Sequence, residues 1–129
     1  AAGGPHPMSR VALVCSEPIR ARAAGIGIRY LELARSLHGA GFDVLLASPP
    51  PAPSADPEAT RPPELPVGVA LAIAEPGRLA RTLAGVAAIL AQGPLANDVL
   101  IELPEVPTVI DLYDLAPVAW SISTSVSFV

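Results

Sequence analysis

The 129-residue sequence contains no lysine and a single cysteine, and each shortage excludes a class of site. All eight basic residues are arginines, so a phosphate-binding loop of the Walker type, which needs a lysine, is excluded. With Cys15 alone, the chain can form neither an internal disulfide framework nor a zinc site built from cysteines. Such cysteine usage favours a reducing compartment, and we expect a cytoplasmic protein.

Charge is also scarce, because charged residues make up 16% of the chain and the formal net charge is -4. This acidic balance argues against a nucleic-acid partner, which would require a basic patch. The mean hydropathy is +0.50, yet proline, glycine or a charge interrupts every apolar run before the ~18 residues that a membrane-spanning helix needs. The apolar runs are typical of strands buried on both faces, and a peripheral membrane contact is left open.

We expect three parts in the chain. Residues 1–8 lack periodicity and end in the sole methionine, so we interpret them as an appended segment before a native start at Met8. Residues 9–117 form one domain, long enough to bury a core without disulfides or metals. Residues 118–129 form a strand-like tail without charge, proline or glycine.

Apolar periodicity predicts strands that alternate with helices, which is the pattern of βαβ units in a parallel sheet. The expected strands are residues 11–14, 42–48, 67–74, 86–91 and 108–112. The expected helices are residues 28–40, 76–83 with Pro76 near its first position, and 94–100. A solvated loop is expected at 49–66, which holds eight of the sixteen prolines. We therefore predict a three-layer, Rossmann-like α/β domain with a parallel sheet of about five strands.

Two glycines, Gly25 and Gly27, follow the first expected strand, where dinucleotide-binding folds hold a diphosphate at a helix N-terminus. The match to that fingerprint is incomplete, because Tyr30 stands at the third glycine position and a long loop precedes Gly25. A loop whose glycines only permit a turn is an equally good interpretation.

Arginines surround these glycines in the sequence. Arg20, Arg22 and Arg29 would bring guanidinium groups to the carboxyl edge of the sheet, where open α/β sheets bind ligands. Guanidinium groups donate two hydrogen bonds at once to a phosphate or a carboxylate. The alternative for each arginine is a solvated surface position.

Polar side chains also follow the fourth and fifth expected strands at the same edge. Asp111, Tyr113 and Asp114 would position a hydroxyl substrate or act as acid and base there. The structural alternative is that Asp114 caps the next segment and Asp111 accepts from a backbone amide. Gln92 and Gly93 would line the same site, and a simple strand-to-helix turn explains them equally well.

The sequence offers no pattern of metal ligands. His38 stands alone, late in an expected helix, and is more typical of a surface residue than of a metal site. Cys15 ends a buried strand and is best interpreted as a packing residue. We therefore expect no bound metal.

Two blocks of the sequence resemble the N-terminal domain of glycosyltransferases with the GT-B architecture, of the family-four-like kind. The first block, residues 11–49, carries Glu17-Pro18, the pattern Gly25-x-Gly27-x-Arg29-Tyr30 and Glu32-Leu33-Ala34. The second block that resembles the family is residues 89–114. Together they cover most of residues 9–114.

The resemblance implies one half of a two-domain enzyme that moves a sugar from a nucleotide-sugar donor to a sugar or glycan acceptor, without a further cofactor. This half would hold the acceptor, and Gly25 and Gly27 would face the donor diphosphate. The sequence departs from the family in two ways. Many relatives carry a histidine after the fifth strand, whereas this sequence has the run from Asp111 to Asp114 there. The donor-binding domain with its paired glutamates is also missing. We therefore expect a fragment that transfers no sugar alone.

Two other function classes compete with this interpretation. One is a non-catalytic, Rossmann-like binding or interaction module. The other is a nicotinamide-dependent oxidoreductase domain, against which Asp43 starts the second strand instead of ending it, so the ribose-binding carboxylate is misplaced.

Apolar residues alternate strictly with serine or threonine from Trp120 to Phe128, which predicts a strand with one apolar face. It contains no charge, proline or glycine, which are features that usually keep an edge strand from pairing with another strand. We expect it to pair with a sheet edge of its own domain or of a second copy, which would give a homodimer. The alternative is a disordered tail.

Overall fold

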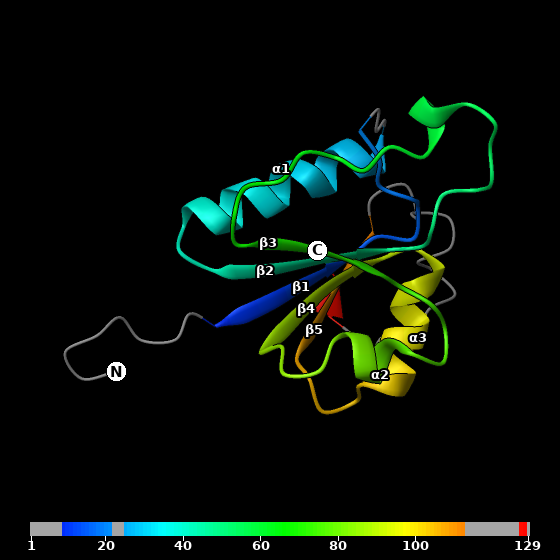
Figure 1. The fold of residues 1–129 in the computed structure, drawn as a ribbon. Helices are drawn as coiled ribbons and strands as arrows, with labels where there is room; N and C mark the ends of the chain where they lie inside the picture. Colours follow the sequence, from blue (N-terminus) through cyan, green and yellow to red (C-terminus); the bar gives the residue numbers. More distant parts are fainter. Residues whose placement is uncertain (1–8, 22–24, 113–126, 129) are drawn as a thin grey trace.

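The described strands of the sheet all run parallel to one another, as Figure 1 shows for the computed structural model. The structure describes residues 9–21, 25–112 and 127–128. Across the sheet the order is β3-β2-β1-β4-β5-β6. The strands are β1 (Arg10–Val14), β2 (Asp43–Ser48), β3 (Val69–Ile73), β4 (Ala88–Gln92), β5 (Thr108–Asp111) and β6 (Ser127–Phe128). The predicted α/β class with a parallel sheet of about five strands is confirmed.

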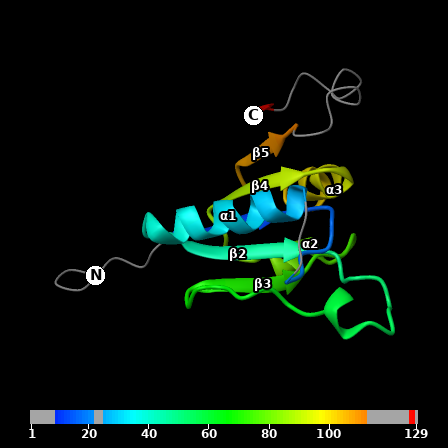
Figure 2. The same ribbon diagram turned by 90° about the horizontal axis from the view of Figure 1, so that it is seen from above.

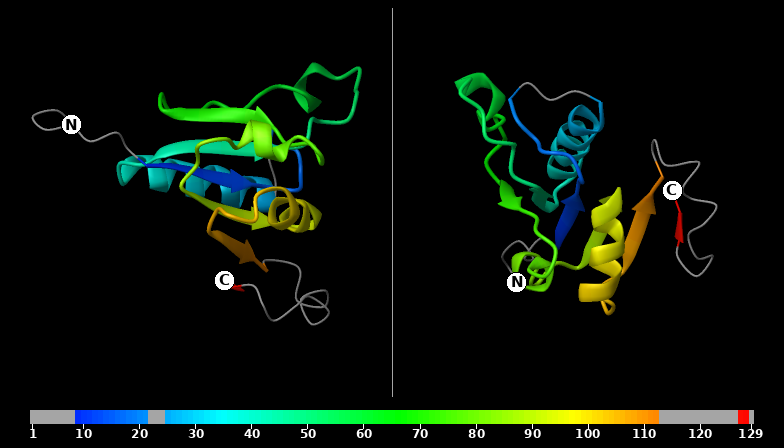
Figure 3. Two further views of the ribbon diagram at one scale, coloured as in Figure 1. Left: turned by 90° about the horizontal axis from the view of Figure 1, so that it is seen from below. Right: turned by 90° about the vertical axis from the view of Figure 1, so that its right-hand side faces the viewer.

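Helices lie on both faces of this sheet and give the domain three layers (Figure 3). One face carries α1 (Ile26–Gly39), and the other carries α2 (Leu79–Thr82) and α3 (Pro94–Glu102). Figure 2 shows the strands side by side beneath α1, from β3 at one edge toward β5. The layers and the strand order are those of a Rossmann-like domain.

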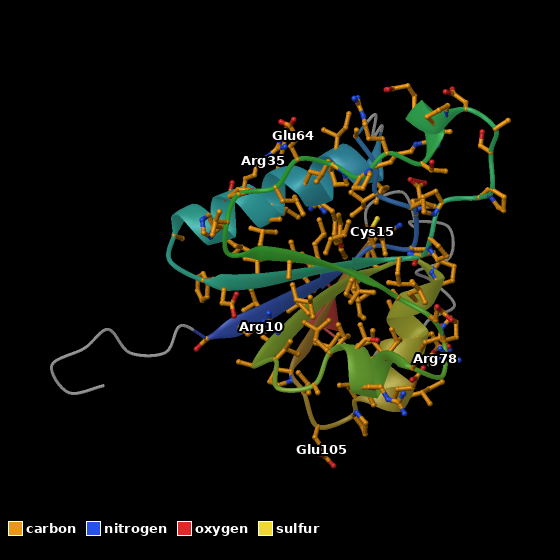
Figure 4. All side chains as sticks on the ribbon, viewed as in Figure 1. Arg10, Cys15, Arg35, Glu64, Arg78 and Glu105 are labelled. Carbon is orange, nitrogen blue, oxygen red and sulfur yellow. The ribbon has the colours of Figure 1, made fainter. Side chains whose placement is uncertain are left out.

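The core consists of two apolar clusters, one on each face of the sheet. Successive side chains of a strand point to opposite faces, so β1 contributes to both clusters. Leu13 and Cys15 pack under α1, whereas Ala12 and Val14 pack against α2 and α3. Figure 4 shows Cys15 between α1 and the sheet. Because β1 is buried on both faces, its apolar run was readable in the sequence.

One helix prediction and one loop prediction need correction. Pro76 does not stand near the first position of a helix, because α2 begins three residues later at Leu79 and has four residues. A turn at Gly77, with φ of +87°, separates Pro76 from the helix. The segment 49–66 is also not loop throughout, since the 3-10 helix η1 (Pro57–Ala59) forms within it.

Two residues of the predicted terminal strand are described, and they extend the domain's own sheet. Ser127 and Phe128 pair in parallel with Val109 and Ile110 of β5. The rest of the tail and the segment expected to be appended at residues 1–8 lie outside the described residues. A homodimer through the tail stays a prediction. Within the described part, no helix combines the length and apolar character needed to span a membrane.

Candidate functional site

The carboxyl ends of β1 and β4 lie side by side at the centre of the sheet, and we call this place the switch point. The chain leaves β1 toward α1 on one face, and it leaves β4 toward α3 on the opposite face. Open parallel sheets bind ligands where the connections diverge in this way. The switch point is therefore the first place to look for a functional site.

Ser16, directly after β1, joins the two connections at the switch point. Its hydroxyl donates to the backbone carbonyl of Gln92 and accepts from the N–H of Leu95 at 3.0 Å. The backbone N–H of Ser16 also donates to Oε1 of Gln92, at 3.3 Å. Ser16 therefore caps the N-terminus of α3 from another loop, and the buried Gln92 side chain holds that loop in place.

Position 93 must be glycine because of this contact and because of its backbone conformation. Its φ of +76° and ψ of -163° lie in a region that is essentially restricted to glycine. A Cβ atom at Gly93 would also clash with the side chain of Ser16. The predicted strand-to-helix turn is thus present, and the closeness of Ser16 leaves no room for a side chain.

A buried polar cluster ties the start of α1 to the end of β5. Asp111 is 2% exposed, and its Oδ2 accepts from the Tyr30 hydroxyl at 3.0 Å and pairs with the Arg29 guanidinium. Burial, followed by the charge of Asp111, raises the pKa of Tyr30 far above its ordinary value, so this phenol stays protonated. The Arg29 guanidinium also lies 5.9 Å from the centre of the Tyr30 ring, within range of a cation–π contact.

This cluster changes the interpretation of Asp111 as a free acid or base. The described partners of its carboxylate are side chains of α1, and its burial keeps it from solvent. The Arg29 side chain, in contrast, is 34% exposed. Asp111 therefore acts on Arg29 by holding it at the carboxyl edge of the sheet.

The first turn of α1 lies at the same edge, and no side chain of the described residues caps it. Its N-cap residue is Gly25, which has a φ of +55° and no side chain that could accept a hydrogen bond from the turn. Gly27 is buried inside that turn. An uncapped helix N-terminus carries partial positive charge and donors that suit an anion.

Of the other predicted arginines, Arg20 does not join this group. Arg20 donates to the backbone carbonyl of Ala59 in η1, at 3.4 Å, on the exposed surface. Arg22, Tyr113 and Asp114 lie outside the described residues. Arg29 is thus the one predicted arginine that the described structure places against the end of β5.

Sequence reasoning missed two residues of the site. Ser16 was not singled out in the sequence, although it directly follows the first strand of a parallel sheet. Tyr30 was noted only at the third glycine position and in the family resemblance, and its hydroxyl partner lies 81 residues away in the sequence. Local periodicity contains no information about such a contact.

Cys15 and the acidic residues offer no further chemistry at the switch point. Burial raises the pKa of the Cys15 thiol to about 11, so it stays protonated and is a poor nucleophile at neutral pH. Among residues 9–21, 25–112 and 127–128, no group of three histidine, cysteine, aspartate or glutamate side chains could hold a metal ion.

No protein-family model matches this chain, and neither does any curated protein or solved structure. The resemblance to GT-B glycosyltransferases consequently depends on the residues quoted for it. The geometry of the carboxyl edge is independent of that resemblance. It consists of the uncapped turn of α1, Arg29 and the switch point.

Proposed function

We propose that this chain is the acceptor-side domain of a glycosyltransferase that moves a sugar from a nucleotide-sugar donor to a sugar or glycan acceptor. The observation that carries the proposal is the uncapped first turn of α1, which Gly25 opens beside Arg29 at the carboxyl edge. The order of the two sequence blocks and the Rossmann-like strand order support it.

The chemistry of a nucleotide diphosphate suits this edge. Its negative charge would be met by the N–H groups of the first α1 turn and by the partly exposed Arg29 side chain. Gly25 has open space around its Cβ position, so a phosphate can approach the backbone closely. Transfer also needs an acceptor aligned with the donor between two domains, so we expect the chain alone to have no transfer activity.

A non-catalytic binding or interaction module is the second candidate, and one observation favours it. The polar groups at the switch point satisfy each other, since Ser16 bonds to Gln92 and Leu95. An oxidoreductase domain has less support. Asp43 pairs with Arg10 at 3.1 Å where β1 and β2 begin, at the opposite edge from the switch point.

Calorimetric titration tests the proposal with UDP-glucose, GDP-mannose and inorganic pyrophosphate as probes. We expect at least one nucleotide sugar to bind, and Arg29→Lys to weaken that binding roughly tenfold, because lysine keeps the charge near Asp111 but loses the two-pronged donor. Arg35→Gln removes an exposed arginine from the same helix and is the matched control, with affinity unchanged.

Two results would contradict the proposal. One is that no nucleotide sugar binds, or that Arg29→Lys binds as tightly as the unaltered chain. The other is tight, saturable binding of NAD, which would favour the oxidoreductase instead.

A further inference from the structure

The strand β3 forms one edge of the sheet, with no described strand beyond it (Figure 2). Gly68 accepts a backbone hydrogen bond from Val44, and Ala74 donates one to Ser48, so the even-numbered residues here bond to β2. Alternate residues of a strand direct their N–H and C=O groups to opposite sides. Leu71 and its odd-numbered neighbours in β3 therefore direct these groups away from the sheet.

This edge lacks two features that usually protect an edge strand from pairing. The strand reads Val-Ala-Leu-Ala-Ile and contains no charge and no proline. Two of its large side chains remain accessible, because Leu71 is 38% exposed and Ile73 is 47% exposed. The outward N–H of Val69 is already bonded to Pro66 at 3.1 Å, and no described residue bonds to the outward groups of Leu71 and Ile73.

The sequence of β3 is close to a palindrome, and this property selects the partner. In an antiparallel pair of two identical strands centred on Leu71, the two Leu71 side chains are opposite each other. Val69 then lies opposite Ile73, and Ala70 lies opposite Ala72. Each facing pair thus joins side chains of similar shape, which is the pattern that stabilises cross-strand pairs.

The residues that flank β3 agree with the same pairing. Pro66 falls opposite Pro76, so the twofold match of the sequence extends beyond the strand on both sides. Glu75 falls opposite Val67, which is 95% exposed, so no like charges face each other. An unrelated strand would have no reason to match this symmetry.

We propose that two copies of this chain pair through β3, antiparallel and about a twofold axis at Leu71, to form one continuous sheet. The N–H and C=O of Leu71 bond to those of Leu71 in the other copy, and each Ile73 N–H donates to the opposite Val69 carbonyl. The contact is the same patch on both copies, so it closes at two chains. It lies away from the switch point and is independent of the proposed function.

Sedimentation velocity over a hundredfold range of concentration tests this with the full chain. We expect twice the monomer mass for the unaltered chain and the monomer mass for Leu71→Lys, because two ammonium groups would then meet at the axis. Ile73→Lys, at a second exposed position, gives the same loss. Ile101→Lys is the matched control, because Ile101 is 68% exposed on α3 and its variant stays a dimer.

Circular dichroism verifies that each variant is folded, and the substituted side chains are exposed enough for lysine to reach solvent. A monomer at every concentration overturns the proposal. So does a dimer that survives both β3 substitutions, since the interface would then lie elsewhere, for example at the terminal strand. Growth beyond two chains also overturns it, because the proposed contact is closed.

Discussion

Asp111 is the one charged side chain that is buried among the described residues, and it is paired with a partly exposed arginine. Removing its charge leaves Arg29 beside an uncharged, buried site. We expect Asp111→Asn to lower the free energy of unfolding by about 2 kcal/mol, below the value for a fully buried pair because solvent screens Arg29. Urea denaturation measures this loss.

The matched control for Asp111→Asn is Asp43→Asn. Asp43 pairs with Arg10, and both side chains are more than one-third exposed, so the loss should stay below about 0.5 kcal/mol. Equal losses for the two variants would contradict a special role for the buried pair.

Gly93 combines a positive φ with close contact to Ser16, whereas Gly85 has a φ of +82° and open space around its Cβ position. We expect Gly85→Ala to cost about 1 kcal/mol, from backbone strain alone. Gly93→Ala should cost roughly 3 kcal/mol, because the clash with Ser16 adds to the strain. Thermal unfolding of both variants measures the difference.

A double variant separates the two causes at Gly93. Ser16→Gly removes the clashing side chain, so Gly93→Ala combined with Ser16→Gly should recover part of the stability that Gly93→Ala loses. If Gly85→Ala and Gly93→Ala are equally destabilising, the contact with Ser16 has no energetic role.

The Cys15 thiol makes the free energy of unfolding depend on pH in the alkaline range. Burial raises its pKa from 9.0 to about 11, so the folded state keeps a proton that the unfolded state loses. The stabilisation is complete below pH 9 and is lost as pH rises to about 11, by about 2–3 kcal/mol. Melting temperatures between pH 8 and 11 should therefore fall more steeply for the unaltered chain than for Cys15→Ala. Parallel curves would contradict this assignment.

At the scale of elements, α2 depends on a carboxylate from α3. Glu102 accepts from the N–H groups of Gly77 at 2.7 Å and Leu79 at 2.9 Å, and so caps a helix of four residues. We expect Glu102→Ala to lower the free energy of unfolding by about 1–2 kcal/mol, measured by urea denaturation.

Glu105 supplies the control for this cap. Its side chain points away from the domain after the end of α3 (Figure 4), so Glu105→Ala should change stability by less than about 0.5 kcal/mol. A loss as large as that of Glu102→Ala would show that the effect comes from net charge and not from capping.

Some helices and strands could be predicted from the sequence and others could not. The central strands were readable because burial on both faces demands continuous apolar runs, as in Val44 to Ala47. The start of α2 was not readable, because it is set by Glu102, which lies 23 residues from Leu79 in the sequence. The contact between Ser16 and Leu95 spans 79 residues and was invisible for the same reason.

For the whole molecule, the candidate site residues lie together at one edge of the sheet. The uncapped turn that begins at Gly25, the held guanidinium of Arg29 and the switch point at Gly93 all lie at carboxyl ends of parallel strands. The sequence predicted from strand polarity that these residues lie at this edge, and their role in binding a ligand stays a prediction. It did not predict that Asp111 would be occupied in holding Arg29, since that depends on how α1 packs against β5.

The most direct test of the account maps amide chemical shifts of the isotopically labelled chain during titration with UDP-glucose and GDP-mannose. We expect the largest shifts at Gly25, Gly27 and Arg29, with smaller ones at Gly93, because phosphate oxygens would bond to the first turn of α1. Gly41, at the far end of α1, should not shift. Shifts confined to other surfaces, or none with either sugar nucleotide, would contradict a ligand site at the carboxyl edge.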